Sequence, residues 1–250
     1  MNQSMKAVLA ATVVLGAASS ARADLTINGA VGLPLNPTAQ IPQEGGVRVQ
    51  GNYYDQGDLG AASFKSYGVV AAGRVADMIE VSGGFNKFDV STGGPLDESG
   101  IALGAKYLFT RESDPVGVRI AAGVGYDRAL LKNTHAYVVG TKYLGAVTGE
   151  KVPITAHLGL RYDRFKAGAA KSNKASVFAG VEFPFTSTGE FAFVGEVQSK
   201  NNEFNNKIPY SASVRYRPQG QGFSVSAGIA RQGLTGDNGL FAQVGYSFGR

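Results

Sequence analysis

Two histidines are the first candidates for acid–base chemistry in this chain of 250 residues. His157 shares the parity of Arg161 and Asp163, so a strand would set these side chains in one column, about 7 Å apart for each pair of residues. A hydrolase needs a nucleophile or an activated water beside such a base, and no serine occupies an obvious partnering position. His135 follows Asp127 across a polar stretch, which could serve a surface protease but suits a solvated histidine better. We therefore expect no enzymatic activity.

Donors for a metal or a cofactor are also missing from the sequence. The chain has no cysteine, no paired histidines and no acidic loop with calcium-binding spacing. It has no phosphate-binding loop of the form Gly-x4-Gly-Lys-Ser/Thr, and its glycines alternate along extended segments instead of opening a helix. We expect neither a metal site nor a cofactor.

Charged side chains instead recur at alternate positions, opposite apolar ones. An Arg or Lys facing lipid near the middle of a membrane costs about 2–4 kcal/mol, so this face is predicted to line a wet interior. Seven basic and five acidic residues would make that interior mildly cationic. The predicted pore-lining residues are Arg48, Glu80, Lys106, Arg119, Asp127, Lys142, Arg161, Asp163, Glu182, Glu196, Arg215 and Arg217.

Two interpretations of this charged face remain open. In the first, which is slightly favoured, it lines a narrow pore whose arginines attract anions, because the guanidinium fork suits carboxylates and phosphates. In the second, the charges pair across the lumen and close it, fixing the strand register while adding little stability. The expected pairs would be Glu182 or Glu196 with Arg215, and Arg119 with Glu80.

Alternation of apolar with small or polar residues predicts β-strands throughout, and no window shows helical spacing downstream of the first residues. Strands of ten or more residues match the length that crosses a membrane at a tilt, and an even number suits a single-chain barrel. The predicted strands are 46–56, 62–75, 78–90, 100–110, 116–127, 135–147, 153–165, 175–186, 190–200, 208–217, 222–231 and 239–249.

The connections between these segments are predicted to alternate in length. From the second strand onward, short turns such as 111–115 and 148–152 alternate with longer polar loops such as 91–99 and 166–174. Short periplasmic turns and longer external loops are typical of membrane barrels.

Aromatic residues are predicted to form two outward bands at the membrane boundaries, where amphipathic rings favour headgroup depth. The periplasmic band comprises Tyr107, Phe109, Phe183, Phe185, Phe191, Phe193, Tyr216, Phe223, Tyr246 and Phe248. The external band comprises Tyr53, Phe85, Tyr126, Tyr137, Tyr162 and Tyr210.

The first 23 residues have the pattern of a secretory signal peptide. Lys6 precedes an apolar run too short to span a bilayer, and residues 21–23 (Ala-Arg-Ala) form a cleavage pattern before Asp24. Removing Lys6 and Arg22 from 24 basic residues leaves 22 against 19 acidic ones, a net charge of +3. That charge is too small to indicate a nucleic-acid partner.

Residues 24–45 differ from the rest because three prolines by Pro42 argue against a continuous strand. We expect either a periplasmic lead-in that closes the barrel floor or a plug that folds into the lumen. The domain organisation is therefore a signal peptide at 1–23, this segment at 24–45 and a β-barrel domain at 46–250.

The C-terminal segment 239–249 alternates Leu240, Ala242, Val244, Tyr246 and Phe248 with small or polar residues, Phe241 excepted. In this it resembles the final strand of bacterial outer-membrane β-barrels of the porin-like type. The resemblance implies an all-β, antiparallel, up-and-down transmembrane barrel. The count of alternating segments gives about 12 strands, within a range of roughly 10–14.

The resemblance also implies export to the outer membrane, with outer-membrane lipid and the barrel-assembly machinery as partners. The expected function is passive diffusion of small hydrophilic, preferentially anionic solutes. One alternative is a closed barrel that serves structurally or binds a partner through its external loops, including Lys171, Lys174 and residues 201–206. Another is a soluble periplasmic β-protein, which would stay in solution without detergent.

Overall fold

The computed structural model describes residues 24–42, 46–59, 62–91, 95–128, 131–145, 153–204, 206–232 and 236–249. The predicted signal peptide and the predicted turn at 148–152 lie outside these ranges. Among the described residues, no helix is long and apolar enough to cross a membrane. The strands are β1 (Val47–Leu59), β2 (Ala62–Ala76), β3 (Ile79–Ser91), β4 (Pro95–Thr110), β5 (Arg119–Arg128), β6 (Lys132–Tyr143), β7 (Thr155–Ala167), β8 (Ala170–Pro184), β9 (Phe191–Gln198), β10 (Tyr210–Tyr216), β11 (Phe223–Arg231) and β12 (Gly239–Phe248).

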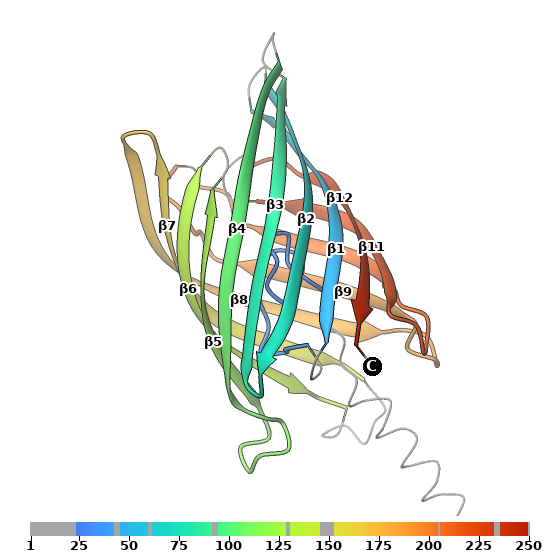
Figure 1. Cartoon of the computed structure of the whole chain (residues 1–250). Helices are drawn as coiled ribbons and strands as arrows, with labels where there is room; N and C mark the ends of the chain where they lie inside the picture. Colours follow the sequence, from blue (N-terminus) through green and yellow to red (C-terminus); the bar gives the residue numbers. More distant parts are fainter. Residues whose placement is uncertain are drawn as a thin grey trace, which may run out of the picture.

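These twelve strands form one closed sheet, shown in Figure 1. Each strand pairs antiparallel with the next along the chain, and β12 returns to pair with β1, beginning with Val47 opposite Phe248. The predicted all-β, up-and-down barrel of twelve strands is confirmed.

The outer surface of the barrel is apolar, as the alternation predicts. Leu160 and Leu240 are 62% and 65% exposed, respectively. Tyr246 and Phe248 lie on β12 next to the C-terminus, and their ring centroids are 4.8 Å apart. Exposed aliphatic side chains with flanking aromatics are the surface that a bilayer accommodates.

The inner surface is polar in most places but carries several aromatic rings. Tyr137 of β6 lies opposite Gly123 of β5, and Phe178 of β8 lies opposite Gly159 of β7. A Cβ atom on either glycine would collide with the facing ring. Glycine at these two positions therefore allows an inward ring to pack directly against the backbone of the neighbouring strand, which no larger residue permits.

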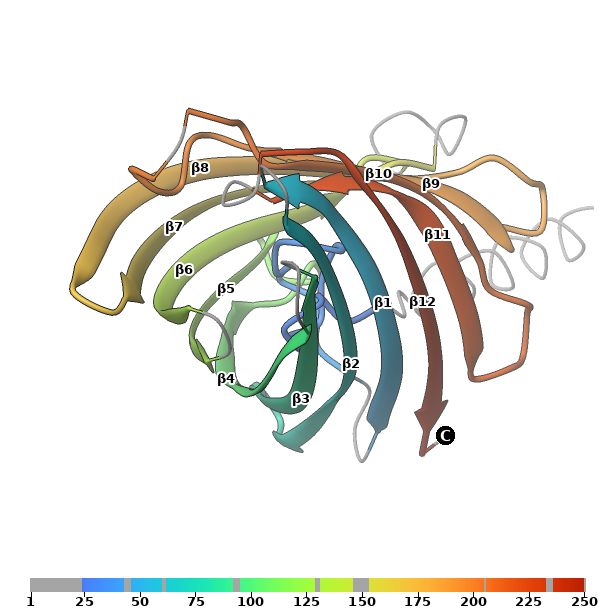
Figure 2. The same cartoon turned by 90° about the horizontal axis from the view of Figure 1, so that it is seen from above.

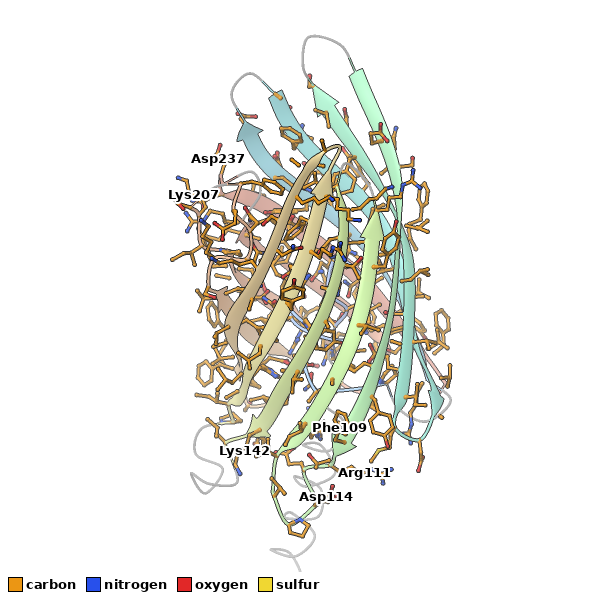
Figure 3. All side chains as sticks on the ribbon, turned by 90° about the vertical axis from the view of Figure 1, so that its left-hand side faces the viewer. Phe109, Arg111, Asp114, Lys142, Lys207 and Asp237 are labelled. Carbon is orange, nitrogen blue, oxygen red and sulfur yellow. The ribbon has the colours of Figure 1, made fainter. Side chains whose placement is uncertain are left out.

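The inward Tyr137 corrects the predicted orientation of β6. Tyr137 is predicted to point outward and Lys142 inward, whereas Tyr137 is buried and Lys142 shares the outward parity of the exposed Val138. Both faces of β6 are apolar in its middle, since Val138 and Val139 are adjacent, so alternation did not fix the parity. Lys142 lies near the end of the barrel, and its Nζ donates to the carbonyl of Gly117 at 3.0 Å (Figure 3).

Connection lengths also differ from the predicted alternation. The loop predicted at 166–174 is a tight turn at 168–169, because the ladder of β7 and β8 continues through polar residues. Gly168 adopts a φ of 58°, which this turn requires and glycine allows. At the other end of the barrel, the short turn predicted at 111–115 is a longer connection, 111–118.

Residues 24–42 lie inside the barrel, where Figure 2 shows them surrounded by the wall. We call residues 24–42 the luminal segment. Its apolar side chains join inward apolar side chains of the strands in three clusters. Leu25 and Val31 pack with Val70 and Ala72, Ile27 packs with Tyr54, Ala230 and Phe241, and Ala39 packs with Leu108, Ala121, Tyr137, Val139 and Phe178.

We expect Leu160→Arg to destabilise the barrel by about 2–4 kcal/mol, because it places a guanidinium on the lipid-facing surface midway along β7. Phe109→Arg, near the end of the barrel in Figure 3, should cost about 0–1 kcal/mol. Urea unfolding in lipid vesicles, followed by the gel mobility of unheated samples, measures both. Equal losses for the two variants would contradict the assignment of depth.

Candidate functional site

The luminal segment is a compact turn structure held by its own backbone. The amide of Gly32 donates to the carbonyl of Asp24 at 2.8 Å, and the amide of Thr38 donates to the carbonyl of Val31 at 3.1 Å. Isolated bridges link Leu25 with Val31 and Gly32 with Pro37. Three prolines and two close glycines exclude a regular strand, so the segment satisfies its amides by turns and by side chains of the wall.

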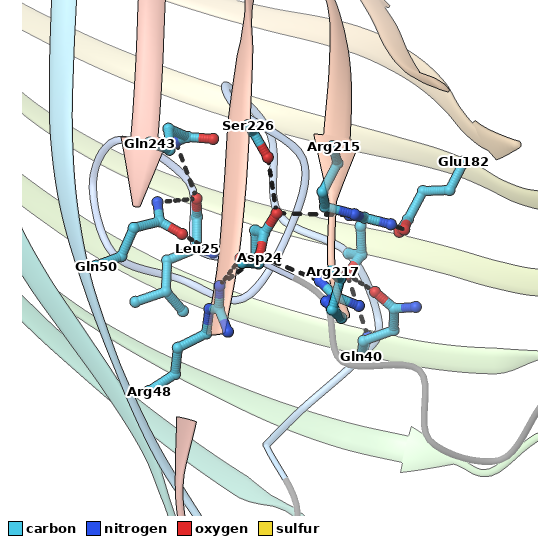
Figure 4. A network of polar contacts seen from close by, with 12 residues as sticks. Asp24, Leu25, Gln40, Arg48, Gln50, Glu182, Arg215, Arg217, Ser226 and Gln243 are labelled. Atoms are coloured by element: carbon cyan, nitrogen blue, oxygen red, sulfur yellow. Dashed lines mark hydrogen bonds and ion pairs between the residues drawn. The ribbon is translucent and has the colours of Figure 1, made fainter. Parts of the chain in front are cut away.

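Asp24 lies at the centre of a cluster of arginines, shown in Figure 4. Its carboxylate is 2.5 Å from Nη2 of Arg48, 3.1 Å from Nη2 of Arg217 and 3.7 Å from Nη1 of Arg215. The hydroxyls of Ser224 and Ser226 donate to the same carboxylate at 2.8 and 3.1 Å. We call these three arginines and two serines the arginine clamp.

The arginine clamp stabilises the ionised form of Asp24. Burial alone would raise the pKa of Asp24, but the guanidinium groups of Arg48, Arg217 and Arg215 outweigh it and hold that pKa well below its usual range. Asp24 is therefore ionised throughout the physiological pH range.

A buried ion pair holds the middle of the luminal segment. Lys106 Nζ is 2.8 Å from Glu80 Oε2, and both side chains are almost fully buried. Glu80 accepts the amide of Val31 at 2.9 Å, while Lys106 donates to the carbonyls of Val31 at 3.0 Å and Thr38 at 3.2 Å. The pair thus forms bonds to the segment that neither partner could form alone without leaving a buried charge uncompensated.

Glu196 binds the tight turn of the luminal segment. Its Oε1 accepts the amide of Leu35 at 2.7 Å and the hydroxyl of Ser211 at 2.6 Å. Its Oε2 accepts both the amide and the side-chain Nδ2 of Asn36 at 3.0 Å. Four donors converging on one carboxylate satisfy its oxygens without a cation.

A polar chain connects the end of the luminal segment with the arginine clamp. The amide of Ala39 donates to Thr141 Oγ1 at 2.9 Å, and the same oxygen lies 2.9 Å from Nδ1 of His157. Nε2 of His157 is 3.2 Å from Glu182, whose second oxygen pairs with Arg215. His157 therefore has a structural partner on each ring nitrogen.

Further along the lumen, several other charged side chains pair with neighbours in the wall. Arg161 Nη2 is 2.9 Å from Asp163, which also accepts from Asn133 at 2.8 Å. His135 Nδ1 lies 3.6 Å from Asp127. The column of inward groups expected from alternation on β7 is present, and two of its members, Arg161 and Asp163, bind one another.

Of the predicted cross-lumen pairs, Glu182 with Arg215 is confirmed. The predicted pair of Arg119 with Glu80 is wrong, because Glu80 binds Lys106 and Arg119 lies 3.4 Å from Glu112 in the connection before β5.

Eleven of the twelve predicted pore-lining residues have inward parity, and Lys142 is the exception. Neutral residues that were not among the predicted pore-lining residues also bind the luminal segment. Gln50 binds both the amide and the carbonyl of Leu25, at 3.1 and 2.8 Å, and Gln243 reaches the same carbonyl at 3.3 Å. One feature of the sequence could have indicated a segment inside the barrel. Phe241 interrupts an otherwise small or polar face and requires an apolar partner in the lumen.

The closed, twelve-stranded antiparallel sheet, with its aliphatic exterior and charged interior, is the architecture of porin-like outer-membrane β-barrels. No protein-family model and no curated protein sequence matches the chain. Solved structures do resemble it in fold.

The fold is similar to that of a KdgM porin, with 12% identity, coverage of 81% of this chain and 99% of that chain, and a TM-score of 0.54. A KdgM porin in complex with disordered oligogalacturonate gives a TM-score of 0.52 at 11% identity, covering 82% and 99% of the two chains. A NanC porin gives a TM-score of 0.52 at 12% identity, covering 82% and 100%. The translocator domain of the autotransporter NalP from Neisseria meningitidis gives 0.52 at 12% identity, covering 82% and 87%. The predicted porin-like barrel fold is confirmed.

We expect Glu196→Gln to loosen the luminal segment by about 1–3 kcal/mol, because the amide NH2 group replaces one oxygen and leaves the donors of Leu35 or Asn36 unpaired. Hydrogen exchange at these two backbone amides should become faster. Glu203→Gln, in an exposed connection, is the matched control and should leave exchange in residues 24–42 unchanged. Equal exchange in the Glu196 variant and the wild type would contradict the role of this carboxylate.

The lowered pKa of Asp24 predicts a particular pH dependence. Because the folded value lies below the ordinary aspartate value of about 3.9, the stability due to ionised Asp24 is complete above that value. It is lost as pH falls further, through the folded pKa. The difference in unfolding free energy between wild type and Asp24→Asn should therefore stay constant from pH 7 to about pH 5 and shrink below that. A difference that vanishes near neutral pH would contradict the clamp.

Proposed function

We propose that the protein is an outer-membrane channel for passive diffusion of small hydrophilic solutes, with a preference for anions. In this proposal the luminal segment narrows the passage. No turnover chemistry and no cofactor are part of the mechanism, and the inward side chains act only by binding, excluding and steering solutes.

The observation that carries the proposal is the charge of the inner wall. Without Lys142, the predicted pore-lining residues comprise six cations and five carboxylates, and five of those cations are arginines. A guanidinium binds carboxylates and phosphates through two parallel donors, and rings of like charge set selectivity in pores. The likeness to a porin solved with oligogalacturonate, a polymer of acidic sugars, supports the same solute class.

The apolar outer surface supports placement in the outer membrane. Exposed aliphatic residues such as Leu158 and Val244 would be costly in water over so large an area. In this proposal the predicted signal peptide directs export, the barrel-assembly machinery inserts the chain, and outer-membrane lipid covers the strands. Small hydrophilic solutes are the partners of the lumen.

A second candidate function is a closed barrel that presents its external connections to a partner. The bonds between the wall and the luminal segment favour this candidate, because they hold the segment inside the lumen. Two residues of the proposed contact surface, Lys174 and Glu203, lie 2.7 Å apart, and Glu203 also lies 3.0 Å from the adjoining Lys200. Such a network would hold the first residues of β8 and the connection after β9 in one arrangement. Residue 205 of the proposed surface lies outside the described residues.

Conductance in a planar bilayer under a salt gradient tests the channel. We expect discrete steps and a reversal potential on the anion side. The triple variant Arg119→Gln, Arg161→Gln, Arg215→Gln should shift the reversal potential toward cations, because the inner wall then carries a net negative charge.

The matched control replaces three arginines whose side chains are exposed outside the lumen, Arg111→Gln, Arg128→Gln and Arg164→Gln. It should keep the selectivity of the wild type. Unchanged selectivity in a folded triple variant of the inner arginines would contradict their role. Silence of the wild type and of a variant lacking residues 24–42 would favour the closed barrel.

A further inference from the structure

The arginine clamp is built from strands that are far from Asp24 in the sequence. Arg48 comes from β1, Arg215 lies on β10 and Arg217 directly follows it, while Ser224 and Ser226 lie on β11. Strand pairing fixes their spacing, because Arg215 is the cross-strand neighbour of Ser226. The clamp is thus a rigid feature of the barrel wall, whereas its occupant belongs to the luminal segment.

Asp24 is the sole charged residue between positions 24 and 42. It is almost completely buried, and each of its carboxylate oxygens accepts from a serine as well as facing guanidinium groups. Removal of the predicted signal peptide would make Asp24 a chain end. A chain end can withdraw from the clamp without breaking any strand pair.

Two of the three clamp arginines have other partners that hold their guanidinium groups in place when Asp24 leaves. Arg215 Nη2 binds Glu182, and Arg48 Nη1 donates to Ser247 Oγ at 2.9 Å. Arg48 also lies against Gly245, where a side chain would collide with it. Arg48 and Arg215 are therefore preorganised by the wall and do not depend on Asp24 for their positions, whereas the side chain of Arg217 pairs with Asp24.

Local charge gives the vacant clamp an affinity for anions. With Asp24 bound, three arginines face the carboxylates of Asp24 and Glu182, leaving one positive charge. Without Asp24, two positive charges remain within a few ångströms. Charge-assisted bonds from several guanidinium groups to one carboxylate are among the stronger polar contacts in proteins.

We propose that the arginine clamp is a binding site for the carboxylate of a permeating solute, and that Asp24 occupies it as a built-in competitor. A carboxylated solute that displaces Asp24 releases this end of the luminal segment and widens the passage. The inference rests on the proposed channel function and adds to it the solute class and the gate. Because Asp24 is tethered, the solute competes with a local concentration in the millimolar range.

Hydrogen exchange of the full chain, exported, purified and reconstituted in lipid, tests the site without requiring conductance. Glucuronate and glucose form a matched probe pair, because both are pyranose sugars and the former bears a carboxylate. At tens of millimolar and constant ionic strength, glucuronate should accelerate exchange of the amides of Leu25 and Gly32 in the wild type by about tenfold, and glucose should not. Asp24→Asn should exchange about tenfold faster without any sugar and gain nothing from glucuronate.

Two further variants keep the test decisive. Asp77→Asn removes an exposed aspartate that pairs with Arg74 and Arg111 in a turn, and it should behave as the wild type. Arg217→Gln retains two clamp arginines, so its hydrogen exchange still tests the site if the Asp24 variant fails to fold. It should show faster basal exchange and a weaker response to glucuronate.

Planar-bilayer recordings separate failure of the site from failure of the channel. Asp24→Asn should raise the open fraction, and glucuronate should raise that of the wild type. If the wild type and Asp24→Asn conduct equally and glucuronate leaves hydrogen exchange unchanged, the proposed site is wrong but the proposed channel is supported. Silence of every variant, together with accelerated exchange in glucuronate, would overturn the channel and retain the carboxylate site.

Discussion

A lipid bilayer offers no hydrogen-bond partner to a peptide group, and this constraint shapes the whole molecule. Twelve strands satisfy one another only because β12 returns to β1, which leaves no edge facing hydrocarbon. Closure then forces each strand to present one face to lipid and the other to a confined interior. The aliphatic exterior and the polar interior both follow from that geometry.

The interior has its own requirement, because charges enclosed by the wall must be compensated. The wall meets part of this requirement by pairs between strands, such as Arg161 with Asp163. The luminal segment meets another part with backbone amides and carbonyls, which bind Glu80, Lys106 and Glu196. Its backbone and one carboxylate thus complement a wall that would otherwise hold unpaired groups. The three apolar clusters also stabilise the luminal segment in the barrel by burying apolar surface, and this contribution does not depend on charge.

Sequence alternation predicted most of the barrel, for a physical reason that also explains the exceptions. Where one face meets lipid and the other meets water, parity is strongly specified, and the strands from β1 to β12 were located within a few residues. On β6 both faces are apolar, because Tyr137 and Val139 pack inside the barrel, and the parity was inverted there. Connection lengths were misjudged because backbone pairing between β7 and β8 continues through polar residues that resemble a loop.

The site was predicted less completely than the sheet. Alternation identifies which charges face inward, but it does not say which of them meet across the lumen. Glu80 pairs with Lys106, its cross-strand neighbour on β4, and the predicted partner Arg119 is bound elsewhere. The course of residues 24–42 depends on bonds to residues up to about two hundred positions away, such as Asp24 with Ser226. No local pattern encodes contacts at that separation.

That separation has a consequence for the order in which the protein assembles. Arg48 belongs to the first strand, while Arg215, Ser224 and Ser226 belong to the tenth and eleventh, so the pocket for Asp24 exists only after β1 has met β12. Asp24, although it precedes every strand in the chain, can therefore bind in its pocket only after nearly the last strands have formed. Contacts that span almost the whole sequence form late and slowly, since loop closure must precede them. Asp24 can thus bind the arginine clamp only after the barrel has closed.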